Sequence, residues 1–279
     1  MDIKKVRLLC FSPTRTSRKV GEAVTRGMEV TEVEICDVTH EALSLPIETP
    51  DNTFTIMAVP VYAGHVPALA LERMDGIRAQ GNAPCAVIVV YGNRDYEGAL
   101  EELAAFASGH GFKVVAAGTF VGEHSYSTEV HPIATGRPDE NDLRDAENFG
   151  KGIREKMTAA PDAGSLSPVE VKAIERPSQP LDRLQAFMGE AVKMRKNGTP
   201  PPAVPETDED LCTHCGRCVK VCPNAAIVKG DECHTLAERC IRCCACVKSC
   251  PHKARSFNIP FAGLLSEYFS EPKANKWML

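Results

Sequence analysis

Two closely related cysteine runs near the C-terminus constrain this sequence more than any other feature. The first begins at Cys212 and reads C-T-H-C-G-R-C-V-K-V-C-P, and the second begins at Cys240 and reads C-I-R-C-C-A-C-V-K-S-C-P. Both have the spacing C-x₂-C-x₂-C-x₃-C-P. A disulfide framework is typical of short secreted chains, and a zinc site needs only paired C-x₂-C hooks. Neither alternative accounts for a third cysteine and a trailing Cys-Pro in each run.

The spacing is that of bacterial-type ferredoxins, in which such cysteines hold iron–sulfur clusters. Three thiolates on one loop hold three corners of an iron–sulfur cube, and in paired motifs the fourth comes from the other half. We therefore predict two [4Fe–4S] clusters with crossed ligation. The first cluster is assigned to Cys212, Cys215, Cys218 and Cys250. The second is assigned to Cys240, Cys243, Cys246 and Cys222.

Five of the thirteen cysteines are left over: Cys10, Cys36, Cys85, Cys233 and Cys244. The first three lie in apolar runs and are most simply small buried residues. Cys244 directly follows a predicted ligand, so it is either an alternative ligand or a spectator. A chain that depends on this many thiolates belongs in a reducing compartment, and we expect it in the cytoplasm.

Composition excludes several classes of partner. The chain of 279 residues has a formal net charge of −5, which argues against nucleic acid because phosphate binding requires clustered positive charge. No apolar run approaches the roughly 18 residues of a membrane span. The N-terminus lacks a long apolar region and a small-residue cleavage site, so we expect no export and no membrane span.

The first 159 residues alternate apolar runs with segments compatible with helices. The expected strands are 3–11, 30–36, 54–59, 84–91 and 112–121. The expected helices are 18–28, 67–74, one ending near residue 108, and 139–157. The run 84–91 is almost continuously apolar, as expected of a strand that is covered on both faces of a parallel sheet. No crossover helix is evident in 37–52. This order predicts a doubly wound α/β domain.

The loop between the first strand and the first helix is rich in hydroxyls: Ser12, Pro13, Thr14, Arg15, Thr16 and Ser17. Free amides at a helix N-terminus favour an anion. The loop resembles the phosphate loop of flavodoxins, S/T-x-T-G-x-T, and this resemblance implies bound FMN. Arg15 stands where the usual glycine would be. It either adds a cation near the phosphate or changes the backbone of the loop.

Two further loops follow later strands at the carboxyl edge of the predicted sheet, beside the topological switch point. They contain Pro60, Val61, Tyr62, Ala63 and Gly64, and then Gly92, Asn93, Arg94, Asp95 and Tyr96. We expect the glycines to let backbone amides approach the flavin ring and the two tyrosines to stack on it. Taken singly, each tyrosine also fits an ordinary loop aromatic. The loop 122–126 is a candidate outer wall. His65 and His124 are either proton relays or surface hydrogen-bonding groups.

Residues 160–205 contain eight of the chain's twenty prolines. We interpret them as a linker, interrupted by a helix near 181–196 that packs on one domain or contacts both. Residues 206–257 then form the iron–sulfur domain. Residues 258–279 are too apolar for a free tail, so we expect them to dock on the protein or on a partner.

The whole layout resembles flavodoxin–ferredoxin fusion proteins. The resemblance implies a flavodoxin-like doubly wound parallel sheet in residues 1–159 and a small α+β bacterial two-[4Fe–4S] ferredoxin domain. It also implies an electron-transfer flavoprotein or oxidoreductase and leaves the substrate unnamed. Such a fusion converts between one-electron cluster chemistry and the one- or two-electron chemistry of FMN.

Three functions remain open. The first is a relay between redox partner proteins, which we favour because no G-x-G-x-x-G nucleotide fingerprint follows a strand. The second is an FMN-dependent reductase that acts on a small molecule and is fed by the clusters. The third is a ferredoxin whose flavodoxin-like domain binds a partner without flavin. The sequence does not decide whether the domains meet within one subunit or across a homodimer.

Basic side chains gather around the second cysteine motif, at Arg239, Arg242, Lys248, Lys253 and Arg255. They form either a solvated face or a functional group of cations. In the functional interpretation they stabilise reduced clusters or dock an acidic electron donor.

Overall fold

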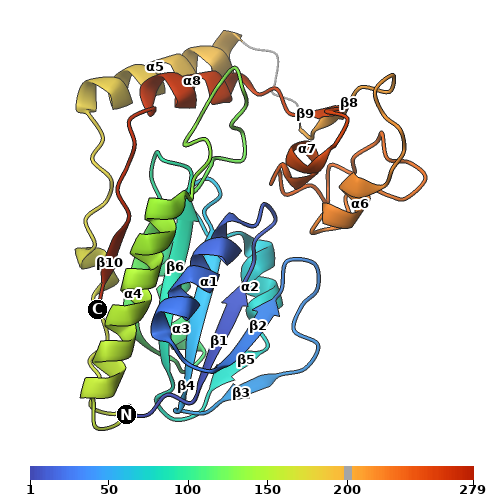
Figure 1. Cartoon of the computed structure of the whole chain (residues 1–279). Helices are drawn as coiled ribbons and strands as arrows, with labels where there is room; N and C mark the ends of the chain where they lie inside the picture. The colour runs from blue at the N-terminus through green and yellow to red at the C-terminus, as the bar shows by residue number, and fades with distance from the viewer. Residues whose placement is uncertain (198–202) are drawn as a thin grey trace. The chain divides into compact units, whose positions relative to one another are not determined.

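A six-stranded β-sheet organises the N-terminal part of the computed structural model, which describes residues 1–197 and 203–279 (Figure 1). Its strands are β1 (Lys5–Cys10), β2 (Glu32–Asp37), β4 (Thr53–Pro60), β6 (Pro84–Tyr91), β7 (Lys113–Val121) and β10 (Lys276–Met278). They lie in the order β10-β7-β6-β4-β1-β2, and all neighbours are parallel except β10 and β7. The five parallel strands thus have the order 2-1-3-4-5 of flavodoxin-like sheets. This confirms the predicted fold class.

Two helices, α1 (Thr16–Met28) and α4 (Glu140–Ala159), lie side by side on one face of the sheet (Figure 1). They approach closely because glycines stand at the crossing. A Cβ at Gly27 would lie 2.0 Å from the carbonyl oxygen of Glu147, and one at Gly150 would lie 2.1 Å from that of Val24. A larger residue at either position would force the helices apart.

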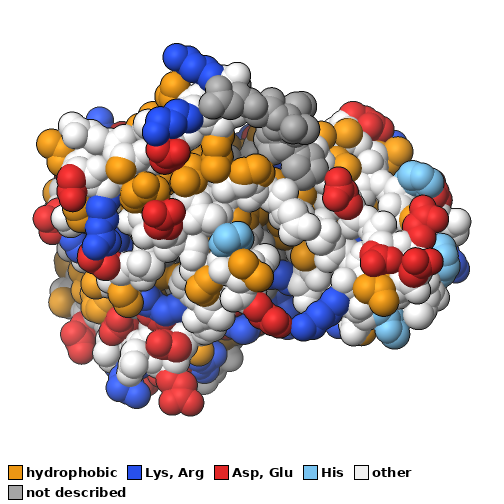
Figure 2. Space-filling model, turned by 90° about the horizontal axis from the view of Figure 1, so that it is seen from above, with side chains coloured by type: hydrophobic (Ala, Val, Ile, Leu, Met, Phe, Trp, Pro, Cys, Tyr) orange, Lys and Arg blue, Asp and Glu red, His pale blue; other side chains and the backbone are white. Residues whose placement is uncertain are grey.

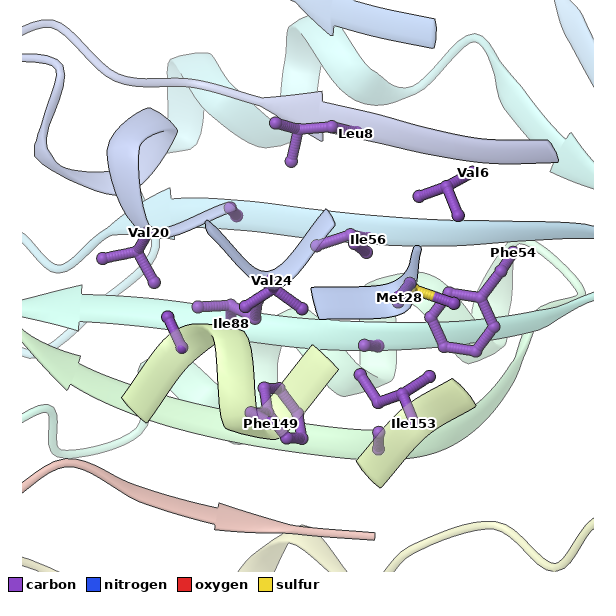
Figure 3. Close-up of a cluster of buried hydrophobic side chains, with 14 of the residues drawn as sticks. Val6, Leu8, Val20, Val24, Met28, Phe54, Ile56, Ile88, Phe149 and Ile153 are labelled. Carbon is purple, nitrogen blue, oxygen red and sulfur yellow. The ribbon is translucent and has the colours of Figure 1, made fainter. Parts of the chain in front are cut away.

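The main core lies between this helix pair and the sheet (Figure 3). Alternate residues of the central strands enter it, among them Val6 and Leu8 of β1 and Phe54 and Ile56 of β4. Phe149 and Ile153 of α4 pack against them. The strand residues between them face the other side of the sheet, where α2 (Ala68–Met74) and α3 (Ala99–Gly109) also bury apolar side chains. Every residue of β6 is buried, as its continuous apolar run predicts.

Some local features differ from the predictions. The strand expected at 30–36 is β2, which lies at the edge of the sheet and leaves Val33 and Ile35 exposed. Residues 37–52 contain no helix; they include instead β3 (Ile47–Thr49), which pairs in parallel with β5 (Ile77–Ala79).

The segment 160–177 contains a short 3₁₀-helix, η1 (Val171–Ala173), and packs along β7. The amide of Val169 donates to the carbonyl of Val114 at 2.9 Å, and the Lys113 ammonium donates to the carbonyls of Ala163 and Gly164. Residues 198–202 of the expected linker lie outside the described residues.

The last residues of the chain return to the sheet. β10 pairs antiparallel with β7, and the Trp277 ring stacks on Phe120 with centroids 6.3 Å apart. Asn275 fixes the approach, since its amide nitrogen donates to Asp142 and Asp145 and its amide oxygen accepts from the Val121 amide. The C-terminal segment therefore forms an integral part of the sheet.

The chain divides into two units. The α/β unit comprises residues 1–123, 136–177 and 273–279, and the second unit comprises residues 124–135 and 178–272. The second unit contains α5 (Leu181–Asn197), β8 (Glu206–Thr207), α6 (Arg217–Val221), α7 (Ala245–Ser249), β9 (Arg255–Ser256) and α8 (Pro260–Tyr268). Its apolar cluster joins α5 to α8 through Phe187, Leu264, Leu265 and Phe269, with Ile133 from the first segment. Within the described residues, no helix has the length and apolar character that crossing a membrane requires.

Candidate iron–sulfur and flavin sites

The two cysteine motifs adopt the same backbone pattern. Left-handed residues stand two and four positions after the first cysteine of each motif, at His214 and Gly216 and again at Arg242 and Cys244. The short helices α6 and α7 then begin at equivalent positions. The two halves are therefore a structural repeat, as their matching spacing predicts.

The cysteines predicted to hold the first cluster line a common cavity. Three come from the first motif and one from the end of the second: Cys212, Cys215, Cys218 and Cys250. Arg255 and His252 also line this cavity. The structure thus brings together three cysteines of one motif with the last cysteine of the other, which is the grouping that the crossed assignment requires.

The other predicted set also lies together. The Cys222 and Cys240 side chains lie close enough to Cys243 and Cys246 to raise the pKa of those thiols, which puts Cys222 beside the second motif. As free thiols these groups are kept protonated mainly by burial, which raises the pKa of Cys243 to about 12 and that of Cys246 to about 11. Cys244 points elsewhere, with its sulfur 3.8 Å from the carbonyl oxygen of Arg242.

One cysteine outside the predicted ligand set also lies at the first site. Ligand atoms of Cys212, His214 and Cys233 lie within 4.8 Å of one another. The His214 ring is held by the buried Glu232, whose carboxylate lies 3.1 Å from Nδ1. This grouping could not be predicted from the sequence, because Cys233 lies between the motifs and has no partner at ligand spacing.

The hydroxyl-rich loop after β1 keeps the backbone that the usual glycine would provide. Arg15 has a φ of 67° and caps the N-terminus of α1, and its side chain is exposed. The Ser12 hydroxyl accepts from the Arg18 amide at 3.1 Å, and the Thr14 and Thr16 hydroxyl oxygens lie 3.5 Å apart. Ser17 is fully buried, and its hydroxyl has no hydrogen-bond partner in the described chain.

The loops after β4 and β6 are joined to each other. The Gly98 amide donates to the carbonyl of Gly64 at 3.1 Å, and a Cβ at Gly64 would lie 2.0 Å from Glu97 Oε2. Glu102 of α3 accepts from the Val66 amide and pairs with His65, and this pairing raises the pKa of that histidine. These loops stand at the carboxyl edge of the sheet, beside the loop after β1.

The position of Tyr96 differs from the expectation that this side chain stacks on the flavin ring. Its ring is buried, at 4% exposure, edge-on against Tyr91, and its hydroxyl donates to the carbonyl of Ile174 at 3.1 Å. Tyr96 therefore anchors the segment after α4 and does not present a free stacking face. Tyr62 is half-buried in the turn closed by its own backbone pairing with His65.

The loop after β7 divides between the two units. Gly122 and Glu123 belong to the α/β unit, and residues 124–135 belong to the second unit. In that unit the Tyr126 ring packs edge-on against Phe257 and beside His124, whose Nδ1 accepts from the Tyr126 amide. Cys240, Cys243 and Cys244 lie close enough to Tyr126 to raise the pKa of its hydroxyl, so this aromatic group lies beside the second cysteine motif.

Comparison with known proteins identifies the cysteine region. Two family models match, and both describe 4Fe–4S binding domains, one over residues 205–228 and one over residues 237–259. A search of curated proteins gave no match.

Solved structures that resemble the chain include flavodoxins. One is from the domain Archaea, with 14% identity, a TM-score of 0.37, and coverage of 55% of this chain and 99% of that chain. Another is flavodoxin 1 from Bacillus cereus, with 16% identity, a TM-score of 0.38, and coverage of 52% and 94%. A further solved structure that resembles the chain is rubredoxin oxygen:oxidoreductase from Desulfovibrio gigas, with 14% identity, a TM-score of 0.40, and coverage of 57% of this chain and 37% of that chain.

The strand order characterises the N-terminal part, and the family models characterise the C-terminal part. The chain is thus a fusion of a flavodoxin-like α/β domain with a pair of 4Fe–4S binding domains.

Proposed function

We propose that this protein relays electrons between two [4Fe–4S] clusters and FMN, and so between redox partner proteins. One observation carries the proposal: a single chain contains both a cavity lined by four cysteines and a phosphate-type loop with a buried, unpaired hydroxyl. The cavity supports a cluster, and the loop supports a phosphorylated cofactor.

The two cysteine sets would hold the clusters as the sequence assigns them. Cys212, Cys215, Cys218 and Cys250 would hold the first, and Cys222, Cys240, Cys243 and Cys246 the second. Cys233 and Cys244 would remain outside the ligand set. The tight loop of each motif would supply three thiolates to one cluster. The last cysteine of each motif would then bind the cluster of the other half.

The loop 12–17 would hold the FMN phosphate. The left-handed backbone of Arg15 supports this, because the position keeps the conformation that a glycine would adopt there. A buried hydroxyl without a partner costs about 1–3 kcal/mol, and a phosphate oxygen would supply the partner that Ser17 lacks. The exposed Arg15 side chain would add a cation near the dianion.

The loops 60–64 and 92–96 would flank the flavin ring. The Gly64 carbonyl accepts a hydrogen bond from the Gly98 amide, which ties the first of these loops to the residues that follow the second. Tyr62 is the remaining aromatic candidate for stacking, since Tyr96 holds the segment near Ile174. His65, which follows the first loop, is the titratable candidate for a proton relay, and its pairing with Glu102 favours the charged form.

Bound FMN exchanges electrons singly or in pairs, whereas each cluster transfers one electron at a time. The chain would provide proximity between these cofactors. It passes from one unit to the other four times, so the units stay at a high effective concentration. The many free thiols support a reducing compartment, for which we propose the cytoplasm.

The basic residues around the second motif support a docking face that is smaller than the sequence suggested. Arg255 is buried and therefore cannot contact a partner protein. The other four basic residues are exposed: Arg239, Arg242, Lys248 and Lys253. Lys253 pairs with Glu129 at 3.0 Å, and both side chains are highly exposed, so the pair adds little stability. Figure 2 shows acidic and histidine side chains gathered at the right of the view. We infer that an acidic redox partner would approach the four exposed cations.

Cofactor analysis of the purified full-length chain tests the proposal. Iron and acid-labile sulfide would be quantified together with flavin released by acid, and reduction would be followed by absorbance. We expect eight iron and eight sulfide atoms for two cubes, one FMN per chain, and cluster reduction followed by flavin reduction.

Each alternative has its own signature in this experiment. Iron–sulfur absorbance without flavin, also after incubation with FMN, would reject the relay in favour of a flavin-free partner-binding domain. Rapid steady-state turnover of a small electron acceptor, together with failure to reduce any acceptor protein, would favour the reductase instead.

A further inference from the structure

Arg255 is a buried cation in the small cysteine-rich domain. Only 4% of the residue is exposed, although arginine is rarely buried without an ionic partner. The guanidinium donates to the carbonyl oxygens of Glu232 at 2.7 Å and Pro205 at 3.5 Å. It also donates to the hydroxyls of Thr207 and Thr235.

All of these partners are neutral. No salt bridge joins Arg255 to a carboxylate within the described residues, and its Nε is buried with no hydrogen-bond partner there. Burying a charge without an opposite charge is costly. The molecule therefore needs another source of negative charge near this guanidinium.

The fold does not itself require a cation at this position. Arg255 stands five residues after Cys250, and the equivalent position in the first half is Ile227, five residues after Cys222. The backbone repeat extends this far, because Ala225 and Lys253 are both left-handed at equivalent positions. Ile227 is also buried, at 2% exposure. In the first half of the repeat, the position equivalent to Arg255 is thus occupied by a buried apolar side chain.

Arg255 stands at both cysteine sites. It lines the cavity that contains Cys212, Cys215, Cys218 and Cys250. It also interacts with the Cys246 thiol of the second set, and its charge reaches Cys240. Among the main electrostatic influences on the Cys218 and Cys246 thiols, Arg255 is the cation common to both.

We propose that Arg255 is a charge-compensating residue shared by the two clusters, which offsets the negative charge that each cluster gains on reduction. This inference rests on the two clusters of the proposed function. A positive charge held in a site of low dielectric favours the reduced, more negative cluster, and local charge is one of the factors that set cluster potentials. Because Arg255 stands at both sites, it raises both reduction potentials.

Three substitutions of the full-length, cluster-loaded protein separate charge from hydrogen bonding. Arg255→Gln keeps an amide donor but removes the charge, Arg255→Met removes both, and Arg255→Lys keeps the charge without the planar fork. Lys229→Gln is the matched control, since Lys229 is an exposed cation of the same domain. Reductive titration followed by electron paramagnetic resonance gives the reduction potential of each cluster, and iron and sulfide content gives cluster occupancy.

We expect Arg255→Gln and Arg255→Met to lower the one-electron reduction equilibrium of both clusters at least tenfold, which is about 59 mV each. Arg255→Lys and Lys229→Gln should change it less than threefold. Equal shifts in Arg255→Lys and Arg255→Gln would assign Arg255 a purely structural role and overturn the inference. So would unchanged potentials in Arg255→Gln at full occupancy.

The inference can also be tested if some of these variants fail to bind the clusters. If Arg255→Gln and Arg255→Met bind no clusters, Arg255→Lys must still bind both at near wild-type potentials, and failure of Arg255→Lys would overturn the inference. If the unsubstituted chain holds only one cluster, the two-cluster relay fails. The shared role of Arg255 then fails with it, whereas unchanged potentials in a fully loaded protein reject the role of Arg255 alone.

Discussion

The amide of Gly98 donates a hydrogen bond to the carbonyl of Gly64 at 3.1 Å, and this bond ties the loop after β4 to the loop after β6. The contact is possible because Gly64 has a φ of 84° and no side chain. Both loops stand at the carboxyl edge of the parallel sheet, where ligands of such folds bind. The shape of the candidate flavin site therefore depends on a residue without a Cβ.

Gly64→Ala should destabilise the α/β unit by about 1–3 kcal/mol, because a Cβ at this φ is strained and would overlap Glu97. It should also reduce FMN retention. Denaturant unfolding can be followed by the fluorescence of Trp277, the only tryptophan, which stacks on Phe120. Gly81→Ala is the control, since Gly81 is left-handed with open space around it. Equal FMN retention in the two variants would contradict the assigned role of Gly64.

Ser17→Ala should have opposite effects on stability and on flavin binding. Removing a buried, unpaired hydroxyl should stabilise the flavin-free protein by up to about 1 kcal/mol. FMN affinity should fall, because the phosphate loses a hydroxyl partner.

Thr55→Val provides the comparison for Ser17. The Thr55 hydroxyl is also buried and unpaired, and it lies near the amino end of β4, away from the carboxyl edge. This variant should be more stable without any loss of FMN affinity. Calorimetric titration of flavin-free protein with FMN measures the difference. An unchanged affinity in Ser17→Ala would remove Ser17 from the proposed site.

The parts predicted from sequence are those that short patterns determine. The apolar run 84–91 indicated a central parallel strand, and β6 is buried along its whole length. The cysteine spacing indicated a repeated iron–sulfur motif, and the family models confirm 4Fe–4S binding domains there. Both signals are local, because strand burial and ligand spacing are encoded within about ten residues.

The features that were not predicted depend on distant contacts. Nothing in Lys276–Met278 indicates an antiparallel partner; its pairing with β7 depends on Asn275 reaching Asp142 and Asp145. Tyr96 looked like a loop aromatic, but Ile174 lies beside it only after the chain folds back. Arg255 was one of five basic residues grouped around the second motif, and its burial was not predicted because its partners Pro205, Thr207, Glu232 and Thr235 lie 20 to 50 residues away.

Crossed ligation predicts which cluster each cysteine supports. Cys222→Ala should remove the second cluster and leave the first, and Cys250→Ala should remove the first and leave the second. Iron content should fall by about half in each, and resonance spectra should identify the surviving cluster. Cys233→Ala should retain both clusters, although its sulfur lies near Cys212. Loss of the first cluster in Cys222→Ala would overturn the assignment.

Electrostatic docking predicts a dependence on ionic strength. Reduction by a small acidic ferredoxin should slow as salt rises from about 0.05 M to about 0.5 M, because screening weakens steering. The double variant Arg239→Gln, Arg242→Gln should be slower at low salt and less sensitive to added salt. Stopped-flow absorbance measures both rates. A salt-independent rate would exclude the four exposed cations as the docking face.

The pairing of His65 with Glu102 predicts a pH-dependent stability. The pairing raises the pKa of His65 above its ordinary value of 6.5, so the folded state holds this proton more tightly than the unfolded state. The stabilisation is therefore complete below pH 6.5 and is lost as the pH rises through the raised pKa of the folded protein. His65→Gln should lower the unfolding midpoint at about pH 5.5 and have little effect at about pH 9. Trp277 fluorescence during denaturant unfolding of both proteins at the two pH values measures this. A larger effect of the substitution at the higher pH would show that the neutral imidazole, and not the ion pair, stabilises the loop.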